Sequence, residues 1–291
     1  MERELWRIVS DKITKLDRQV PMNRHTHSVG RIVRVYLWAV LHDRPVYWAC
    51  RRAHWAGVRP PVALPDCSTM SRRLRTLAVR VFLDALGQRL CEGVTEGMIK
   101  RMDGKPLPIS RHSVDADATF GRGAGGTDRG YKLHALWGCG PMPIAWEVHP
   151  INVSEKRVAG SLLSKLDGGG YVLADANYDK GQLYDHAAEH NHQLVAPRQK
   201  IGVGFGHRHQ SRHRLRSVQL LEDPSPFGRA LHRVRRQIET DFAGLTSFGG
   251  GLVGLPPWAR GLHRVRLFVH AKLIINAARL LRPNRPAKRA A

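Results

Sequence analysis

Acidic residues are scarce in this sequence. Its 291 residues include 24 Asp and Glu against 47 Lys and Arg, which gives a formal net charge of +23. Such an excess of positive charge is unusual for an enzyme of small metabolites and attracts polyanions, of which nucleic acid is the most common. Seven Trp and 42% hydrophobic residues argue against a ribosomal-type basic chain. The sequence therefore predicts a folded basic protein, long enough for one large domain or two modest ones, that binds nucleic acid.

Cysteine and long hydrophobic runs are also scarce. The four cysteines show no C-x-x-C spacing, which excludes a zinc ribbon or a disulfide framework and indicates reduced thiols in a cytosolic compartment. The apolar run over residues 35–41 is too short to cross a bilayer, and the charged start Met1–Glu4 does not resemble a signal peptide. We expect a soluble cytoplasmic protein without a membrane partner.

The first 97 residues have a helical pattern. Apolar residues recur every three to four positions over residues 5–16, and residues 29–41 give a second helix. After a Pro-Pro break, Asp66 or Ser68 can start a helix that presents Arg72, Arg73 and Arg75, as in the recognition helix of a helix-turn-helix. These three arginines are candidate DNA contacts, although a solvated helix face would have the same composition.

Beyond residue 97 the pattern changes from helix to strand. Extended segments at 98–102, 107–109, 131–137 and 144–149 precede a helix at 158–166, a strand at 171–174, a helix at 182–190 and a strand at 193–196. A final helix is expected over residues 226–245, and Gly121–Gly126 and residues 201–216 are expected to be loops. This order predicts an α/β fold of the ribonuclease H-like type, a mixed sheet flanked by helices.

Three acids occupy positions where they can meet. Asp175 ends the buried strand at 171–174, Asp103 follows the first strand, and Glu239 lies beside the apolar stripe of the last helix. Each has a simpler interpretation: Asp175 as a helix cap, Asp103-Gly104 as a hairpin turn, and Glu239 as a surface partner of a neighbouring Arg. Asp115 or Asp117 is an alternative to Asp103.

Three converging carboxylates repel one another unless cations separate them. Their oxygens suit hard divalent ions such as Mg²⁺ or Mn²⁺. Two such ions about 4 Å apart can clamp the attacking and leaving oxygens of a phosphodiester displacement. Together with the basic charge, this predicts metal-dependent chemistry on DNA.

Six blocks of the sequence carry a family resemblance. They read MDGKPLPIS, GYKLHALW, PMPIAWEVHPINVSE, YVLADANYD, LVAPR and RVRRQIETDFAGLTSFGG, in this order. Over residues 98–282 the chain resembles bacterial insertion-sequence transposases of the DDE type, in the groups named after insertion sequences four and five. The resemblance implies that Asp103, Asp175 and Glu239 bind two metal ions. It also implies cleavage at transposon ends, joining of the 3′ hydroxyl to target DNA, a homo-oligomer on paired terminal inverted repeats, and a location at the bacterial nucleoid.

The family has a further signature around its Glu: Tyr, two residues, Arg, three residues, Glu, six residues, Lys. Arg235 and Glu239 match it, whereas His232 replaces the Tyr and Thr246 replaces the Lys. A polar side chain at His232 can still hold a phosphate, but the missing Lys affects how the ends are bound.

Other residues are candidate DNA contacts. Lys132 and His134 alternate onto one face of their strand and point either to the active edge or to solvent. Between Arg198 and Arg236 ten Arg and Lys face two acids, so Arg198, Arg235 and Arg236 are expected to neutralise phosphates without reading sequence.

Two rival functions follow from the same residues. A tyrosine recombinase needs an Arg/His cluster such as residues 207–214 and a nucleophilic Tyr, but no Tyr follows that cluster. A transposase relic that binds DNA without cutting it is consistent with Thr246 at the signature position. In the favoured interpretation, residues 1–97 form a helical DNA-binding region, 98–282 the catalytic domain and 283–291 a basic tail.

Overall fold

The computed structural model describes residues 2–19, 26–123, 125–199, 204, 210–235, 237–247 and 251–282. The chain divides into two compact units. One comprises Met1–Gly93, Phe248–Gly251 and His270–Ala291, and the other comprises Val94–Ser247 and Leu252–Val269. The division falls within the long helix α11 (Leu262–Leu280), whose two parts belong to different units.

The first unit is helical, as the sequence predicts. Its own elements are α1 (Glu2–Asp17), α2 (Val29–Leu41), α3 (Val46–Ala49), the 3-10 turn η1 (Arg52–His54), α4 (Cys67–Arg73) and α5 (Leu77–Leu90). Asp66 caps α4 by accepting a hydrogen bond from the Thr69 N–H at 2.8 Å, which confirms the predicted helix start. The core contains stacked indoles, with the Trp38 and Trp55 ring centroids 5.1 Å apart.

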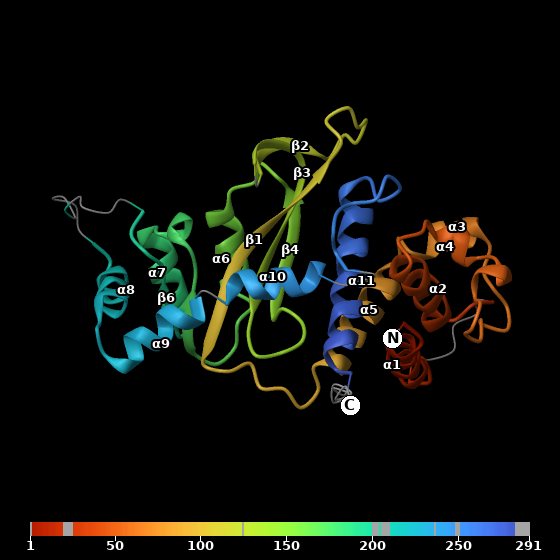
Figure 1. The fold of residues 1–291 in the computed structure, drawn as a ribbon, viewed down its shortest axis with the longest axis horizontal. Helices are drawn as coiled ribbons and strands as arrows, with labels where there is room; N and C mark the ends of the chain where they lie inside the picture. The colour runs from red at the N-terminus through yellow and green to blue at the C-terminus, as the bar shows by residue number, and fades with distance from the viewer. Residues whose placement is uncertain are drawn as a thin grey trace, which may run out of the picture. The chain divides into compact units, whose positions relative to one another are not determined.

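The second unit is built on one mixed sheet. Among the described residues its strands are β1 (Ile99–Ile109), β2 (Thr119–Gly123), β3 (Gly126–Trp137), β4 (Ala145–Pro150), β5 (Gly170–Leu173) and β6 (His192–Val195). Their order is β2-β3-β1-β5-β6, and β4 also pairs with β3 (Figure 1). β3 is antiparallel to β1 and β4, whereas β1, β5 and β6 are parallel. This arrangement confirms the predicted mixed α/β fold.

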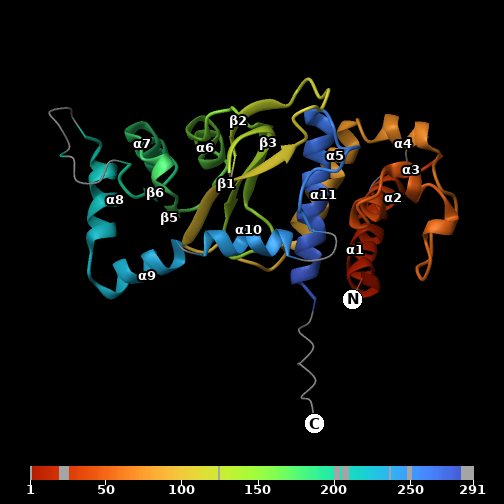
Figure 2. The same cartoon turned by 45° about the horizontal axis from the view of Figure 1, so that its top comes forward.

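Helices cover both faces of this sheet because its central strands are apolar on both sides. On one face α6 (Glu155–Leu163) and α7 (Gly181–Glu189) pack their buried residues against Met102, Leu136 and Val172. On the other face Leu173 and Val195 contact Leu231 of α9 (Pro226–Arg235), with α8 (Arg212–Glu222) beside them. Figure 2 shows α10 (Ile238–Thr246) along β1 on the side away from α6.

Three local predictions were wrong. The expected helix over residues 226–245 is two helices, α9 and α10: Leu231 packs on β5 and β6, whereas Phe242 packs on Trp137 of β3. Because neighbouring strands of a sheet are twisted relative to one another, one straight helix does not make both of these contacts. Gly121–Gly123 belong to β2 and Gly126 begins β3, which is antiparallel to β2, and residues 212–216 belong to α8, which Ser211 caps.

None of the described helices combines the length and apolar character needed to cross a bilayer. Helix α11 is rich in apolar residues, and most of its side chains are buried. Within the first unit, Lys272 of this helix pairs with Asp43 at 2.6 Å and donates to the Val40 carbonyl at 3.0 Å. The helix therefore serves packing.

Candidate active site

Asp103 and Asp175 each lie two residues beyond the last residue pair that joins β1 to β5. These two strands pair Ile99 with Tyr171 and Arg101 with Leu173. At this point β1 continues as a strand, but the chain leaves β5. Asp103-Gly104 is thus part of a continuous strand and not a hairpin turn.

Asp175 is fixed by the turn that follows β5. It is the N-cap of the 3-10 turn η2 (Ala176–Tyr178), and its carboxylate accepts hydrogen bonds from the Asn177 N–H at 2.9 Å and the Asn177 side-chain amide at 3.1 Å. These bonds hold the carboxylate at the carboxyl end of β5. The capped element is this turn and not the helix that begins at Gly181.

The surroundings of Asp103 change the pKa of its carboxyl group. Burial raises the pKa of Asp103 to about 6, and the negative charges of Asp175 and Glu155 act in the same direction. The Gly104 N–H, which donates to this carboxylate at 2.7 Å, and the charge of Lys132 oppose the shift. In the metal-free protein the charge of Asp175 therefore disfavours the charged form of Asp103.

Lys132 and His134 are both in the protein interior. The Lys132 ammonium lies 2.6 Å from the Glu155 carboxylate, and the two side chains are 9% and 23% exposed. His134 is 1% exposed, and neither ring nitrogen has a hydrogen-bond partner within the described part of the chain. Burial lowers the pKa of His134 to about 4, with Lys132 and His149 adding to the effect, so the ring is neutral at pH 7. In this conformation neither side chain is placed for direct contact with DNA.

Glu239 lies in the first turn of α10 and is exposed. An ion pair between Arg101 Nε and Asp241, at 2.6 Å, anchors this helix to β1 two residues before Asp103. Because strand side chains alternate, Arg101 and Asp103 share one face of β1, the face that α10 approaches. Glu239 is not among the charges that act most strongly on Asp103. No three His, Cys, Asp or Glu side chains of the described residues form a group that could hold a metal ion.

The alternative first ligands have structural roles. Asp115 accepts from the Tyr131 hydroxyl at 2.8 Å and from the Gly261 N–H at 2.9 Å, and Asp117 accepts from the Leu262 N–H at 2.7 Å. Both carboxylates therefore hold the start of α11.

The predicted DNA contacts are spread over both units. Arg198 is half-buried just after β6. In the first unit Arg72 and Arg75 are exposed, whereas Arg73 donates to the His27 carbonyl at 3.1 Å. Arg236 and the side chains of His232 and Arg235 lie outside the described residues.

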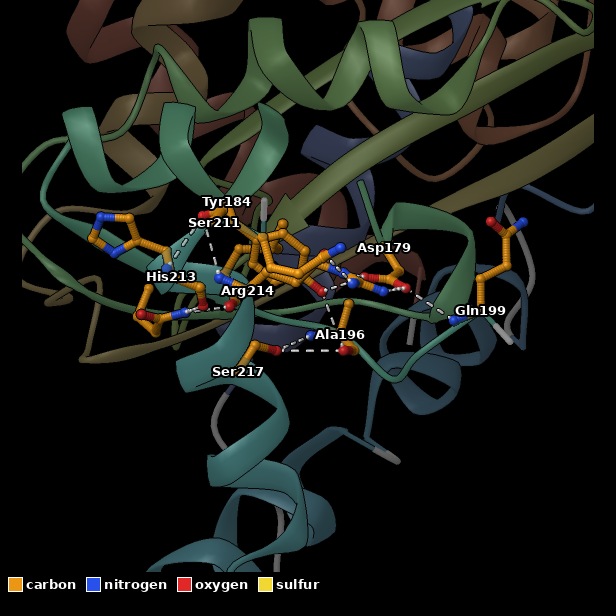
Figure 3. A network of polar contacts seen from close by, with 11 residues as sticks. Asp179, Tyr184, Ala196, Gln199, Ser211, His213, Arg214 and Ser217 are labelled. Carbon is orange, nitrogen blue, oxygen red and sulfur yellow. Dashed lines mark hydrogen bonds and ion pairs between the residues drawn. The ribbon is translucent and has the colours of Figure 1, made fainter. Parts of the chain in front are cut away.

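A second polar network fixes the loop that carries Asp175. Asp179 receives a bidentate ion pair from Arg214 of α8 at 2.7 and 2.8 Å, and its carboxylate also accepts from the Gln199 N–H and the Tyr184 hydroxyl (Figure 3). Ser217 bonds both backbone groups of Ala196. Arg214 is thus engaged within the protein, which removes it from the Arg/His cluster that a tyrosine recombinase would need.

The sequence over residues 99–275 matches the family described as the transposase DDE domain. The chain belongs to this family. Among proteins of curated function, none matches the transposase sequence. A solved structure, the cryo-EM structure of the piggyBac transposase synaptic complex with hairpin DNA, shares 9% identity with a TM-score of 0.36. That match covers 98% of this chain and 80% of the other.

Two carboxylates at this edge of the transposase sheet, those of Asp103 and Asp175, are of the chemical type that binds divalent cations. Asp103 and Asp175 offer hard oxygen ligands, and their repulsion would be relieved by a cation between them. Sequence reasoning missed two neighbours of this pair, Glu155 and Tyr178. No sequence signal identifies these two residues, because their position depends on how α6 and η2 pack on the sheet.

Proposed function

We propose that this transposase cleaves DNA at transposon ends and joins the freed 3′ hydroxyl to target DNA, with Asp103, Asp175 and Glu239 as its catalytic acids. The observation that supports this most is that Asp103 and Asp175 follow the paired residues of two neighbouring parallel strands and that the charge of Asp175 raises the pKa of Asp103. Family membership supports chemistry on DNA.

The chain's own residues would hold and orient the reacting groups. Asp103 and Asp175 would hold Mg²⁺ or Mn²⁺, two ions in all, with Glu239 joining them when α10 moves closer over the face shared with Asp103. The bound ions would activate the attacking oxygen and stabilise the leaving one. The hydrogen bonds from Asn177 keep Asp175 aimed at this edge, and the Asp179–Arg214 pair restrains its loop.

The rest of the proposal concerns DNA. The net charge of +23 favours phosphate neutralisation over a wide surface. We assign backbone contacts to Arg198, His232, Arg235 and Arg236 in the catalytic region 98–282, and to Arg72, Arg73 and Arg75 in the helical region 1–97. The exposure of Arg72 and Arg75 suits that role. A homo-oligomer would hold the paired terminal inverted repeats.

The direct test is Mg²⁺-dependent nicking of a duplex that carries the inverted repeats flanking the reading frame. Asp175→Asn should reduce the nicking rate by at least about a hundredfold, because a bound metal ion contributes several kcal/mol to the transition state. Asp167→Asn changes an exposed acid in the loop before β5 and serves as the matched control.

Two results would contradict the proposal. Nicking that survives Asp175→Asn would show that the cation site is elsewhere. Tight binding of the duplex without nicking by the unaltered chain would favour a transposase relic that binds DNA without cutting it. In the structure the Thr246 hydroxyl donates a hydrogen bond to the Ala243 carbonyl of its own helix.

A further inference from the structure

The strand at one end of the sheet, β2, turns its large side chains toward solvent. Its sequence is Thr-Phe-Gly-Arg-Gly, and the aromatic residue, Phe120, is 54% exposed. The small residues lie on the other face of the strand. The Thr119 hydroxyl donates to the Asn152 side chain at 2.9 Å, and a Cβ atom on Gly121 would come within 3.0 Å of the Ile151 backbone. Because strand side chains alternate, this close packing directs Phe120 to the opposite, open face.

Phe120 lies on the sheet face that carries Asp103. In β1, Asp103 and Ile109 are six residues apart and therefore share one face. Ile109 pairs with Arg129 of β3, which in turn pairs with Phe120, and paired residues of antiparallel strands point to the same side. Phe120 is thus about 20 Å beyond Asp103 along the strands, at about 3.4 Å per residue. Since β5 makes its last pair with β1 before Asp103, this part of the sheet extends past the end of β5.

Arg129 supports the Phe120 ring from one side. The central carbon of its guanidinium group lies 5.7 Å from the ring centroid, a cation–π contact. The guanidinium nitrogens donate to four backbone carbonyls of the segment that joins β1 to β2, those of Arg111, Ser113, Asp115 and Ala118. Because these bonds hold the arginine in place, the ring rests on a fixed cation, and its exposed part is a rigid apolar surface.

The surroundings of this ring are basic. Arg122 lies two residues beyond Phe120, on the same face of β2, and is exposed. Arg111 is also exposed, and it donates to the carbonyl of Thr127, the residue that pairs with Arg122. Asp117, an acid of the neighbouring segment, instead accepts a hydrogen bond from the start of α11. Arginines beside an exposed aromatic ring are typical of surfaces that bind single-stranded nucleic acid, because phosphates pair with the arginines and bases stack on the ring.

On the basis of the proposed function, we further propose that this face of β2, formed by Phe120, Arg122 and Arg111, binds unpaired nucleotides of the cut DNA. One base stacks on the Phe120 ring on the side away from Arg129, and the two exposed arginines hold the neighbouring phosphates. A strand released at the edge where Asp103 lies reaches this surface after about six nucleotides, at about 3.4 Å per nucleotide. Duplex DNA suits the ring less well, because its bases are already stacked on one another.

Fluorescence anisotropy in EDTA compares the binding of a short single strand with that of the matching duplex. Phe120→Ala should weaken binding of the single strand by about tenfold, because it removes the stacking surface, and should leave duplex binding close to that of the unaltered chain. Phe120→Trp keeps an aromatic face and should retain the affinity for the single strand. Arg122→Gln should reduce the slope of log affinity against log salt concentration for the single strand by about 0.7.

Tyr47→Ala is the matched control. Tyr47 is 55% exposed but belongs to the first unit, so its loss should change neither binding constant. A second measurement needs no variant: ultraviolet cross-linking of a single strand that carries 5-iodouracil, followed by mass spectrometry, should label the peptide that contains Phe120.

The outcomes separate this inference from the proposed function. Unchanged single-strand affinity in Phe120→Ala, an equal loss for single strand and duplex, an equal loss in Tyr47→Ala, or cross-links confined to other peptides would each overturn the inference. Nicking that depends on Asp175 would still support the proposed function in all of these cases. If the unaltered chain bound neither the single strand nor the duplex, both would fail.

Discussion

The negative charge of Asp103 lowers the stability of the folded protein in the absence of cations. Its pKa of about 6 in the folded chain lies above the ordinary value of 3.8, because burial and the neighbouring carboxylates disfavour its charge. The folded state therefore binds this proton more tightly than the unfolded state. Stability falls as the pH rises from about 4 to about 6, and above that range the whole cost remains.

Replacing the charge should consequently stabilise the metal-free protein. We expect Asp103→Asn to raise the free energy of unfolding by about 1–3 kcal/mol at pH 7.5 in EDTA. The gain should vanish below pH 4, where the native carboxyl is protonated in both states. Urea unfolding at the two pH values measures it. A variant less stable than the unaltered chain at pH 7.5 would show that Asp103 serves the fold and not a cation.

The two aspartates could be predicted from sequence, whereas their neighbours could not. Asp175 follows an apolar run and precedes a turn, so its place at a strand end is a local property. The proximity of Glu155 and Tyr178 depends on how α6 and η2 pack on the sheet, which periodicity does not show. The burial of Lys132 and His134 has the same origin, since α6 covers the strand face that an alternating pattern leaves open to either interpretation.

The loop between β5 and α7 depends on helix α8. Burial by itself would raise the pKa of Asp179. The pKa nevertheless lies below its ordinary value, because Arg214 and the Gln199 N–H donate hydrogen bonds to the charged carboxylate. This contribution to stability is present above the unfolded pKa and is lost as the pH falls through the folded one. The bidentate ion pair between Arg214 and Asp179 thus connects α8 to the segment that follows Asp175.

Breaking the Asp179–Arg214 ion pair should destabilise the second unit. Arg214→Ala leaves the nearly buried Asp179 carboxylate, 3% exposed, without its main partner. We expect a loss of about 2–4 kcal/mol at pH 7, and a smaller loss at pH 3, where Asp179 gains a proton. Denaturant unfolding checks both values. Arg216→Ala, an exposed arginine on the same helix, should change little, and an equal loss in both variants would refute the specific role of the pair.

Helices and strands were predicted well where the spacing of apolar residues indicates one type of element. The ranges of α1, α2, α6, α7 and the main strands follow from apolar spacing and turn residues. The division of the last predicted helix into α9 and α10 does not, because it results from the twist of the sheet beneath. The start of α8 within a stretch rich in Gly, His and Arg depends on Ser211 as a cap, a signal that the basic composition concealed.

For the whole molecule, the net charge is the property that bears most on the proposed binding of DNA. With a net charge of +23, contacts to six to ten phosphates would release that many counterions. We expect affinity for a random duplex to fall by about a thousandfold or more between 50 and 200 mM salt. Fluorescence anisotropy at several salt concentrations measures the slope of log affinity against log salt concentration.

Single arginines should contribute to this slope in a predictable way. Replacing Arg72 or Arg75 with Gln should reduce its magnitude by roughly one each, since each would neutralise one phosphate. A salt-independent affinity would exclude this electrostatic mode. An unchanged slope in both variants would exclude α4 and the residues directly after it from the DNA-binding surface.

The most direct measurement replaces the divalent ion with Fe²⁺ and lets ascorbate generate hydroxyl radicals at the bound metal. If Asp103 and Asp175 hold the cation, the backbone should be cut near residues 103 and 175, Mg²⁺ should suppress both cuts, and Asp103→Asn should abolish them. Cuts confined to other segments, or cuts near both residues that persist in Asp103→Asn, would contradict the account.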